Sequence, residues 1–172
     1  MQQDNFLCEQ VTTMMVIEHD GLGGVIADRD STRHTLRGDG TTQEILHIDG
    51  KSFAFSLSPQ SFFQTNTRGC ELLYSTVANI LQESQATTLY DLYCGTGTIG
   101  QIIGSLVPSV QKVIGIDIVP EAIDDARANA ERLGVAFQTE YHAGPVEAIF
   151  PTLTVDQAST IIVDPPRAGL HQ

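Results

Sequence analysis

The sequence predicts an α/β fold with a parallel, helix-wound sheet, preceded by a small β-rich segment. From residue 88 onward, short β-prone runs alternate with amphipathic helical segments, which is the pattern of strand–helix–strand crossovers. A glycine-rich turn over residues 95–100 joins the first of these strands to a helix. The first third of the chain instead contains β-prone runs separated by turn residues. We therefore expect a β-rich segment over residues 1–62 and the N-terminal part of an α/β domain over residues 63–172.

The β-rich segment contains one clear hairpin signal. Residues 44–57 place an Asp-Gly dipeptide, typical of a type I′ turn, between two β-prone runs with alternating apolar side chains. Strands are also expected at 11–17 and 25–27, whereas the polar residues 28–40 are expected to form a loop. A connector with two aromatic residues, 58–67, then leads into the α/β half.

The α/β half is predicted from hydrophobic periodicity and from helix end signals. Pro120 at a first helical position and Gly134 after a last one bound one helix between them. The expected helices cover residues 67–82, 98–106, 120–133 and 146–150, and the expected strands cover 88–91, 113–117, 135–141 and 160–163.

Composition limits the classes of function. The 172 residues carry a formal net charge of −12, which disfavours a broad surface for binding polyanions. No apolar run approaches the ~20 residues of a membrane span, and no secretory leader is visible, so we expect a cytoplasmic protein without a membrane partner. The three cysteines are too scattered for a disulfide framework or a metal site. The local accumulation of cations at Arg29, Arg33 and Arg37 is typical of a solvated loop.

The glycine-rich turn indicates a nucleotide-like ligand. Gly95, Gly97 and Gly100 satisfy the G-x-G-x-x-G pattern of dinucleotide sites, which is a weak signal by itself. Asp91 at the mouth of the turn would repel a pyrophosphate, but a carboxylate suits the sulfonium and amino groups of S-adenosylmethionine. We favour that cofactor over a dinucleotide and over a turn with no ligand.

Three predicted strands end in carboxylates, and ligands of parallel sheets bind at the carboxyl ends of strands. We therefore expect Asp91, Asp117 and Asp164 to line one crevice. Asp117 lies 20 residues after Gly97, the separation typical of an acid that accepts ribose hydroxyls, although a capping carboxylate is the alternative. Two prolines after Asp164 make a stiff strap that aims its side chain, or else simply end the strand.

Three ordered motifs together carry a family resemblance. Phe-Phe-Gln-Thr-Asn at 62–66, Asp-Leu-Tyr-Cys-Gly-Thr-Gly at 91–97 and Asp-Pro-Pro-Arg-Ala-Gly-Leu at 164–170 resemble the RNA uracil-5-methyltransferase family. The likeness covers about residues 50–172. It implies a Rossmann-like methyltransferase fold, S-adenosyl-L-methionine as cofactor, and tRNA or rRNA as a substrate held largely by parts outside this chain. Arg167 stands where methyltransferases for exocyclic amines place an aromatic residue, which counts against such an amine as acceptor.

The resemblance also implies roles for single residues. The residues that match cofactor contacts of the family are Gln64, Tyr93, Gly95, Thr98, Asp117 and Asp164. The family often places Asp or Asn near the adenine after the third crossover strand, whereas residues 142–145 here read His-Ala-Gly-Pro.

In the family, a cysteine thiolate adds to carbon 6 of uracil and a carboxylate later removes the proton from carbon 5. Both groups follow the proline strap, and no cysteine follows it here, so we expect the nucleophile beyond Gln172 and a domain truncated at its C-terminus. Cys94 matches a small buried thiol of the family. We then expect the fragment alone to be inactive. The alternatives are a catalytically silent cofactor-binding module and a methyltransferase for a small molecule or protein.

Overall fold

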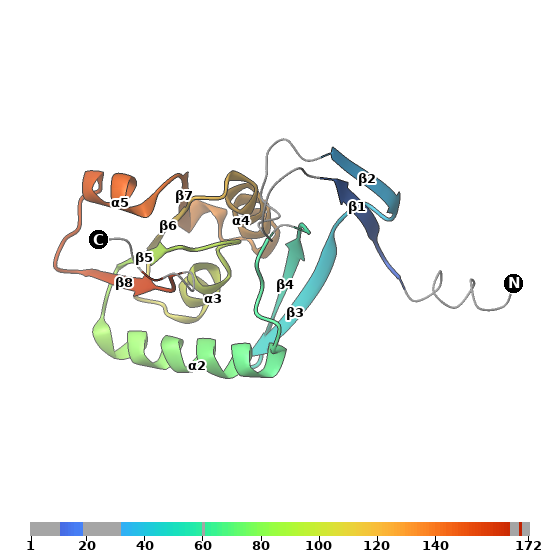
Figure 1. The fold of residues 1–172 in the computed structure, drawn as a ribbon. Coiled ribbons are helices and arrows are strands. Elements are labelled where there is room, and N and C mark those ends of the chain that lie inside the picture. The colour runs from blue at the N-terminus through green and yellow to red at the C-terminus, as the bar shows by residue number, and fades with distance from the viewer. Residues whose placement is uncertain (1–10, 19–31, 60, 166–168, 170–172) are drawn as a thin grey trace, which may run out of the picture.

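The computed structural model of the chain describes residues 11–18, 32–59, 61–165 and 169. Its centre is a four-stranded parallel sheet with the strand order β7-β6-β5-β8 (Figure 1). The strands are β5 (Thr88–Leu92), β6 (Lys112–Asp117), β7 (Thr139–Ala143) and β8 (Ser159–Val163). β5 pairs in parallel with both β6 and β8, so the chain changes its direction of travel across the sheet at β5. Such a switch point is where open α/β sheets bind ligands.

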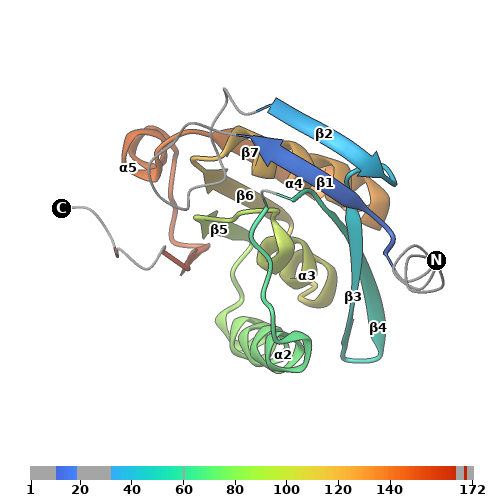
Figure 2. The ribbon, with the colours of Figure 1, turned by 45° about the vertical axis from the view of Figure 1, so that its right-hand side comes forward.

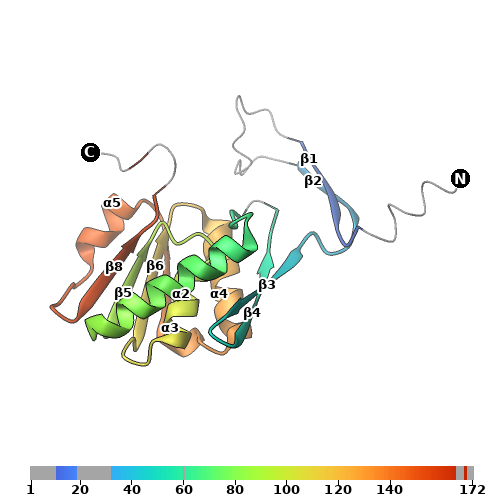
Figure 3. The ribbon, with the colours of Figure 1, turned by 90° about the horizontal axis from the view of Figure 1, so that it is seen from below.

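Helices cover both faces of the sheet, which confirms the predicted α/β class. They are α2 (Thr67–Ser84), α3 (Thr98–Leu106), α4 (Pro120–Leu133) and α5 (Val146–Ile149), with 3-10 turns η1 (Ala136–Gln138) and η2 (Phe150–Thr152). Leu89 of β5 packs with α2 and α3, whereas its neighbour Tyr90 packs with α5 and η2. Figure 3 shows α2 and α3 in front of the strands.

The hairpin formed by β3 (Thr42–Ile48) and β4 (Lys51–Leu57) lies beside α2, α3 and α4 (Figure 2). Its turn residues Asp49 and Gly50 have φ of 50° and 77°, the left-handed geometry of a type I′ turn. Its inward face shares one core with α2 and α3, made of Leu46, Ile48, Phe53, Phe55, Leu57, Cys70, Tyr74 and Ile102. The hairpin is therefore packed into the α/β body.

Two short strands, β1 (Met14–Glu18) and β2 (Thr32–Arg37), form an antiparallel ribbon that projects away from the sheet (Figures 1 and 3). The prediction of a loop over residues 28–40 is wrong for residues 32–37, which form β2. Every side chain of β2 is exposed, so its polar sequence lacks the alternation that predicts a strand, and pairing with β1 forms it. The expected strand at 25–27 and Arg29 lie outside the described residues.

Most of the predicted helix and strand ends in the α/β half agree with the structure. α4 begins at Pro120, and Gly134 caps it in the left-handed conformation, with φ of 73°. The expected strand at 135–141 is wrong in its first half, because Ala136–Gln138 form a 3-10 turn before β7 begins at Thr139. Among the described residues, no helix is both long and apolar enough to cross a membrane.

Candidate functional site

The loop between β5 and α3 is shaped by residues with left-handed backbone. Gly97 has φ of 71° and immediately precedes α3, and a Cβ there would lie 2.6 Å from the Tyr141 hydroxyl oxygen and 2.7 Å from Nε2 of Gln101. A Cβ at Gly95, with φ of 52°, would meet nothing within 4 Å. Gly97 thus packs tightly against the protein, whereas Gly95 borders open space where a ligand can approach the backbone.

Gln101 of α3 connects the glycine loop to neighbouring elements. Its side chain is fully buried, and Nε2 donates to the Ala126 carbonyl (2.8 Å), the Tyr141 hydroxyl (2.8 Å) and, more weakly, the Thr96 carbonyl (3.4 Å). These contacts join the loop to α4 and β7. The glycine loop is therefore preorganised by buried hydrogen bonds.

Tyr93 begins the loop with a strained backbone. Its φ is 64°, an uncommon value for a bulky residue, and its hydroxyl donates to Oε1 of Glu147 (2.8 Å). The hydrogen bond to Glu147 raises the pKa of Tyr93. Strained residues of this kind cluster at binding and catalytic sites.

Asp117, the last residue of β6, ties its strand to the loop. Its Oδ2 accepts the Gly95 N–H (2.8 Å), and its Oδ1 accepts the Val119 N–H (2.9 Å) at the start of α4. Each oxygen keeps a further lone pair for another donor. The carboxylate is thus oriented by two backbone amides beside the open side of Gly95.

Asp91 lies beneath the loop, with only 1% of its surface exposed, and not at its mouth as the sequence suggested. Its Oδ2 accepts the Gly100 N–H (3.0 Å), whereas Oδ1 has no hydrogen-bond partner among the described residues. Burial raises the pKa of Asp91 to about 7, against the Gly100 hydrogen bond, and the nearby charges of Asp164 and Asp117 raise it further. The prediction that all three acids line one crevice is therefore wrong: they lie near one another, but only Asp164 lines the pocket.

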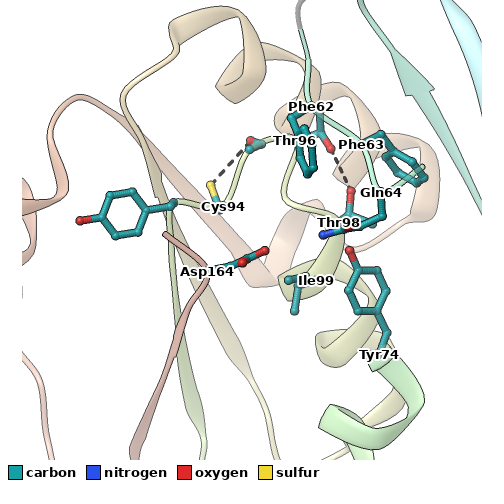
Figure 4. Close-up of a pocket in the computed structure, with 11 residues that line it drawn as sticks. Phe62, Phe63, Gln64, Tyr74, Cys94, Thr96, Thr98, Ile99 and Asp164 are labelled. Atoms are coloured by element: carbon teal, nitrogen blue, oxygen red, sulfur yellow. Dashed lines mark hydrogen bonds between the residues drawn. The ribbon is translucent and has the colours of Figure 1, made fainter. Parts of the chain in front are cut away.

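A pocket open to solvent lies between the glycine loop, α2 and the end of β8 (Figure 4). Asp164 reaches it from the end of β8, while Tyr74 points its hydroxyl into it from α2. The Oγ1 atoms of Thr96 and Thr98 lie 2.8 Å apart in a hydrogen bond on the loop side. The lining residues are Phe62, Phe63, Gln64, Tyr74, Tyr93, Cys94, Gly95, Thr96, Thr98, Ile99 and Asp164.

The two cysteines that the structure describes are buried and free. Burial raises the pKa of both the Cys94 and the Cys70 thiol, and the charges of Asp91 and Asp117 add to the effect at Cys94. A neutral thiol is a poor nucleophile. Within the described part of the chain, no group of three or more His, Cys, Asp and Glu side chains could hold a metal ion.

The structure brings most of the predicted site residues together. Those that line the pocket are Gln64, Tyr93, Gly95, Thr98 and Asp164. Asp117 does not line it and instead contacts Gly95 at its edge. Sequence reasoning missed Tyr74, which is 3% exposed, because an aromatic residue on the buried side of a helix is typical of core packing.

Comparison with known proteins agrees with this geometry. Residues 83–165 match the family model described as a methyltransferase domain. Over that stretch the chain is similar to methyltransferase domains. Its fold is the Rossmann-like one that the motifs implied, and the resemblance to RNA uracil-5-methyltransferases is confirmed.

The similar proteins include curated and solved relatives. Over 117 residues the chain is 45% identical to an RNA methyltransferase of Clostridium tetani, covering 68% of this chain and 25% of that protein. It is 41% identical over 129 residues to the human tRNA (uracil-5-)-methyltransferase homolog A, and the match covers 73% of this chain and 20% of the human protein. The structure is also similar to the crystal structure of Pyrococcus abyssi tRNA (uracil-54, C5)-methyltransferase in complex with S-adenosyl-L-homocysteine, with a TM-score of 0.58 and 30% sequence identity. This match covers 80% of this chain and 31% of the Pyrococcus abyssi chain. The chain thus spans 20–28% of the length of the curated relatives it matches.

Proposed function

We propose that this methyltransferase chain is the S-adenosylmethionine-binding portion of an enzyme that methylates carbon 5 of uridine in tRNA or rRNA. The observation that carries the proposal is the pocket beside Gly95, at the switch point of the sheet, lined by residues of all three family motifs. A cytoplasmic location is part of the proposal.

The groups that surround the pocket fit this cofactor. The space beside Gly95 lets a ligand reach the backbone. Thr98 opens α3, where Asp91 accepts the Gly100 N–H, so the N–H groups of Thr98 and Ile99 remain for a ligand carboxylate. The Asp164 carboxylate and the face of Phe62 both suit a ligand that carries positive charge. The carboxylates of Asp117 and Asp164 at this end of the sheet would repel a pyrophosphate, which favours a sulfonium nucleoside over a dinucleotide.

The residues have separable roles in this proposal. Asp117 accepts the ribose hydroxyls, since two backbone amides already orient its carboxylate. Gln64 contributes an amide that both donates and accepts, and Tyr93 forms a side of the pocket while Glu147 holds its hydroxyl. Asp164 faces the reacting end of the cofactor. The bound cofactor would supply an electrophilic methyl group, and the chain's own residues would orient it and exclude water.

The chain by itself should bind the cofactor without transferring its methyl group to RNA. Attack on carbon 6 of uracil needs a reactive thiolate, whereas Cys70 and Cys94 are buried and their pKa values are raised. We therefore propose that the nucleophile is neither of these residues.

Titration calorimetry with S-adenosylhomocysteine tests the proposal. We expect Asp117→Ala and Asp164→Asn each to weaken binding by about tenfold or more, because each removes a charged hydrogen-bonding group from the site. Asp124→Asn, an equal loss of charge on the exposed side of α4, is the control and should bind as the wild type does. Absence of binding by the wild type would refute the cofactor assignment. Methylation of a uridine-containing RNA by the chain alone, if it persists in Cys8→Ser, would refute the assignment of Cys70 and Cys94 as inert thiols.

A further inference from the structure

We propose that Asp125 and Asn129 of α4 are positioning residues that hold residues 61–66, the pocket segment, as one wall of the cofactor pocket. The pocket segment contributes Phe62, Phe63 and Gln64 to the lining and belongs to no helix or strand. The inference rests on the proposed cofactor and adds to it a role for α4, which contributes no residue to the pocket lining.

Asn129 anchors the strand that leads into the pocket segment. Its side chain is fully buried, its Oδ1 accepts the Ser56 N–H (2.8 Å), and its Nδ2 donates to the Ser56 carbonyl (3.0 Å). A side-chain amide thus satisfies both backbone groups of one residue of β4, as a neighbouring strand would. This contact fixes β4 against α4 only a few residues before the pocket segment begins.

Asp125 lies one helical turn before Asn129 and holds the start of the pocket segment. Its Oδ2 accepts both the Ser58 N–H (3.0 Å) and the Ser61 hydroxyl (2.6 Å). The Ser61 N–H also donates to the Ser58 carbonyl (3.1 Å), so the two serines that contact Asp125 contact each other as well. Residues at i and i+4 share one face of a helix, so Asp125 and Asn129 act on the same stretch of chain.

The rest of the pocket segment has few constraints of this kind. Phe63 packs on Phe55 with ring centroids 6.0 Å apart, and Asn66 accepts the Gly69 N–H (3.0 Å) as the cap of α2. Phe62, between Ser61 and Phe63, is 72% exposed. The Asp125 carboxylate therefore fixes the first residue of the segment, next to the exposed Phe62.

The same helix also holds the opposite wall of the pocket. The Val119 N–H at its start donates to Asp117, and the Ala126 carbonyl accepts from Gln101 beneath the glycine loop. Ala126 is adjacent to Asp125 in sequence. α4 is thus a common support for both walls, and loss of the Asp125 contacts would separate Gln64 from the loop without altering the loop.

Cofactor affinity and hydrogen exchange test the inference. We expect Asp125→Ala to weaken S-adenosylhomocysteine binding about tenfold, since it removes two hydrogen bonds to a carboxylate. Asp125→Asn keeps an acceptor oxygen and should bind within about twofold of the wild type. Asp124→Ala, an identical exchange on an exposed neighbour, is the control. Ser61→Ala removes the bond from the Ser61 hydroxyl to Asp125, together with the contact between the Ser58 and Ser61 hydroxyls (2.9 Å), and should weaken binding about threefold.

A double-mutant cycle with Gln64→Ala separates positioning from general destabilisation. If Asp125 acts through the pocket segment, the double variant should lose less affinity than the product of the two single losses, by about threefold. The peptide covering residues 56–66 should also exchange its amides faster in Asp125→Ala, while β5 and β6 stay protected.

Unchanged affinity in Asp125→Ala, or strictly multiplicative losses in the cycle, would overturn the inference while the proposed function stands. If the wild type binds no cofactor, the proposed function fails, and exchange alone decides: unchanged exchange of residues 56–66 overturns the role of Asp125, and faster exchange there supports it.

Discussion

Replacing Asp91 by Asn tests whether the buried carboxyl under the glycine loop makes the stability of the protein depend on pH. The folded structure raises the pKa of Asp91 from 3.8 to about 7, mainly through burial. Asp91 therefore holds its proton more tightly in the folded chain than in the unfolded one. Its contribution to stability is fully present below about pH 4 and is lost as the pH rises through about 7.

The magnitude follows from these two pKa values. A pKa that rises from 3.8 to about 7 is a roughly thousandfold change in proton affinity, or about 4 kcal/mol over the full range. Between pH 5 and pH 8 the corresponding loss of unfolding free energy is roughly 2–3 kcal/mol. An Asn side chain does not titrate, so it makes no pH-dependent contribution to the unfolding free energy. Its carbonyl can still accept the Gly100 N–H. The NH₂ group of Asn would stand in place of Oδ1 of Asp91, which has no partner among the described residues. Burying this unpaired donor lowers the unfolding free energy by about 1–3 kcal/mol at every pH.

Urea unfolding of both proteins at several pH values between 5 and 8 measures this difference. We expect wild-type stability to fall relative to Asp91→Asn by roughly 2–3 kcal/mol across the range, whatever the offset between the two curves. Asp124→Asn controls for the removal of one negative charge from a chain of net charge −12. Parallel curves for wild type and Asp91→Asn would show that burial does not hold the Asp91 proton.

Three further predictions concern the loop, the thiols and the hairpin. Gly97→Ala should lower the unfolding free energy in urea by at least about 2–3 kcal/mol, because the alanine would have left-handed backbone and its Cβ would clash with Tyr141. Gly95→Ala should lower it by only about 1–2 kcal/mol, since there the backbone alone is unfavourable. Equal losses would contradict the packing of the loop. Cys94 should resist alkylation in the folded protein, since burial raises the pKa of its thiol, and mass spectrometry of native and urea-treated samples would reveal early labelling if it does not. Phe55→Ala should cost about 3–5 kcal/mol and lower a single cooperative transition, because the hairpin shares its core with α2 and α3; two separate transitions would indicate an independent hairpin.

The predicted strand–loop–helix unit and the ends of α4 agree with the structure because short-range chemistry sets them. Pro120 cannot donate a backbone hydrogen bond, and Gly134 adopts left-handed backbone without a steric penalty, so each marks a helix end wherever the helix packs. The same holds for the turn at Asp49 and Gly50. β2 lacked such a signal, since its side chains are all exposed and its pairing with β1 alone makes it a strand.

The sequence alone was enough to predict the α/β class, most of the helices and strands in their order, and five of the eleven residues that line the pocket. The tertiary structure alone decided the depth of Asp91, the presence of Tyr74 in the pocket, and the contacts of Asn129 with Ser56, 73 residues away in the chain. The reason is physical. Turns and caps depend on a few neighbouring residues, whereas burial, pKa and side-chain partners depend on which distant segments the fold packs together.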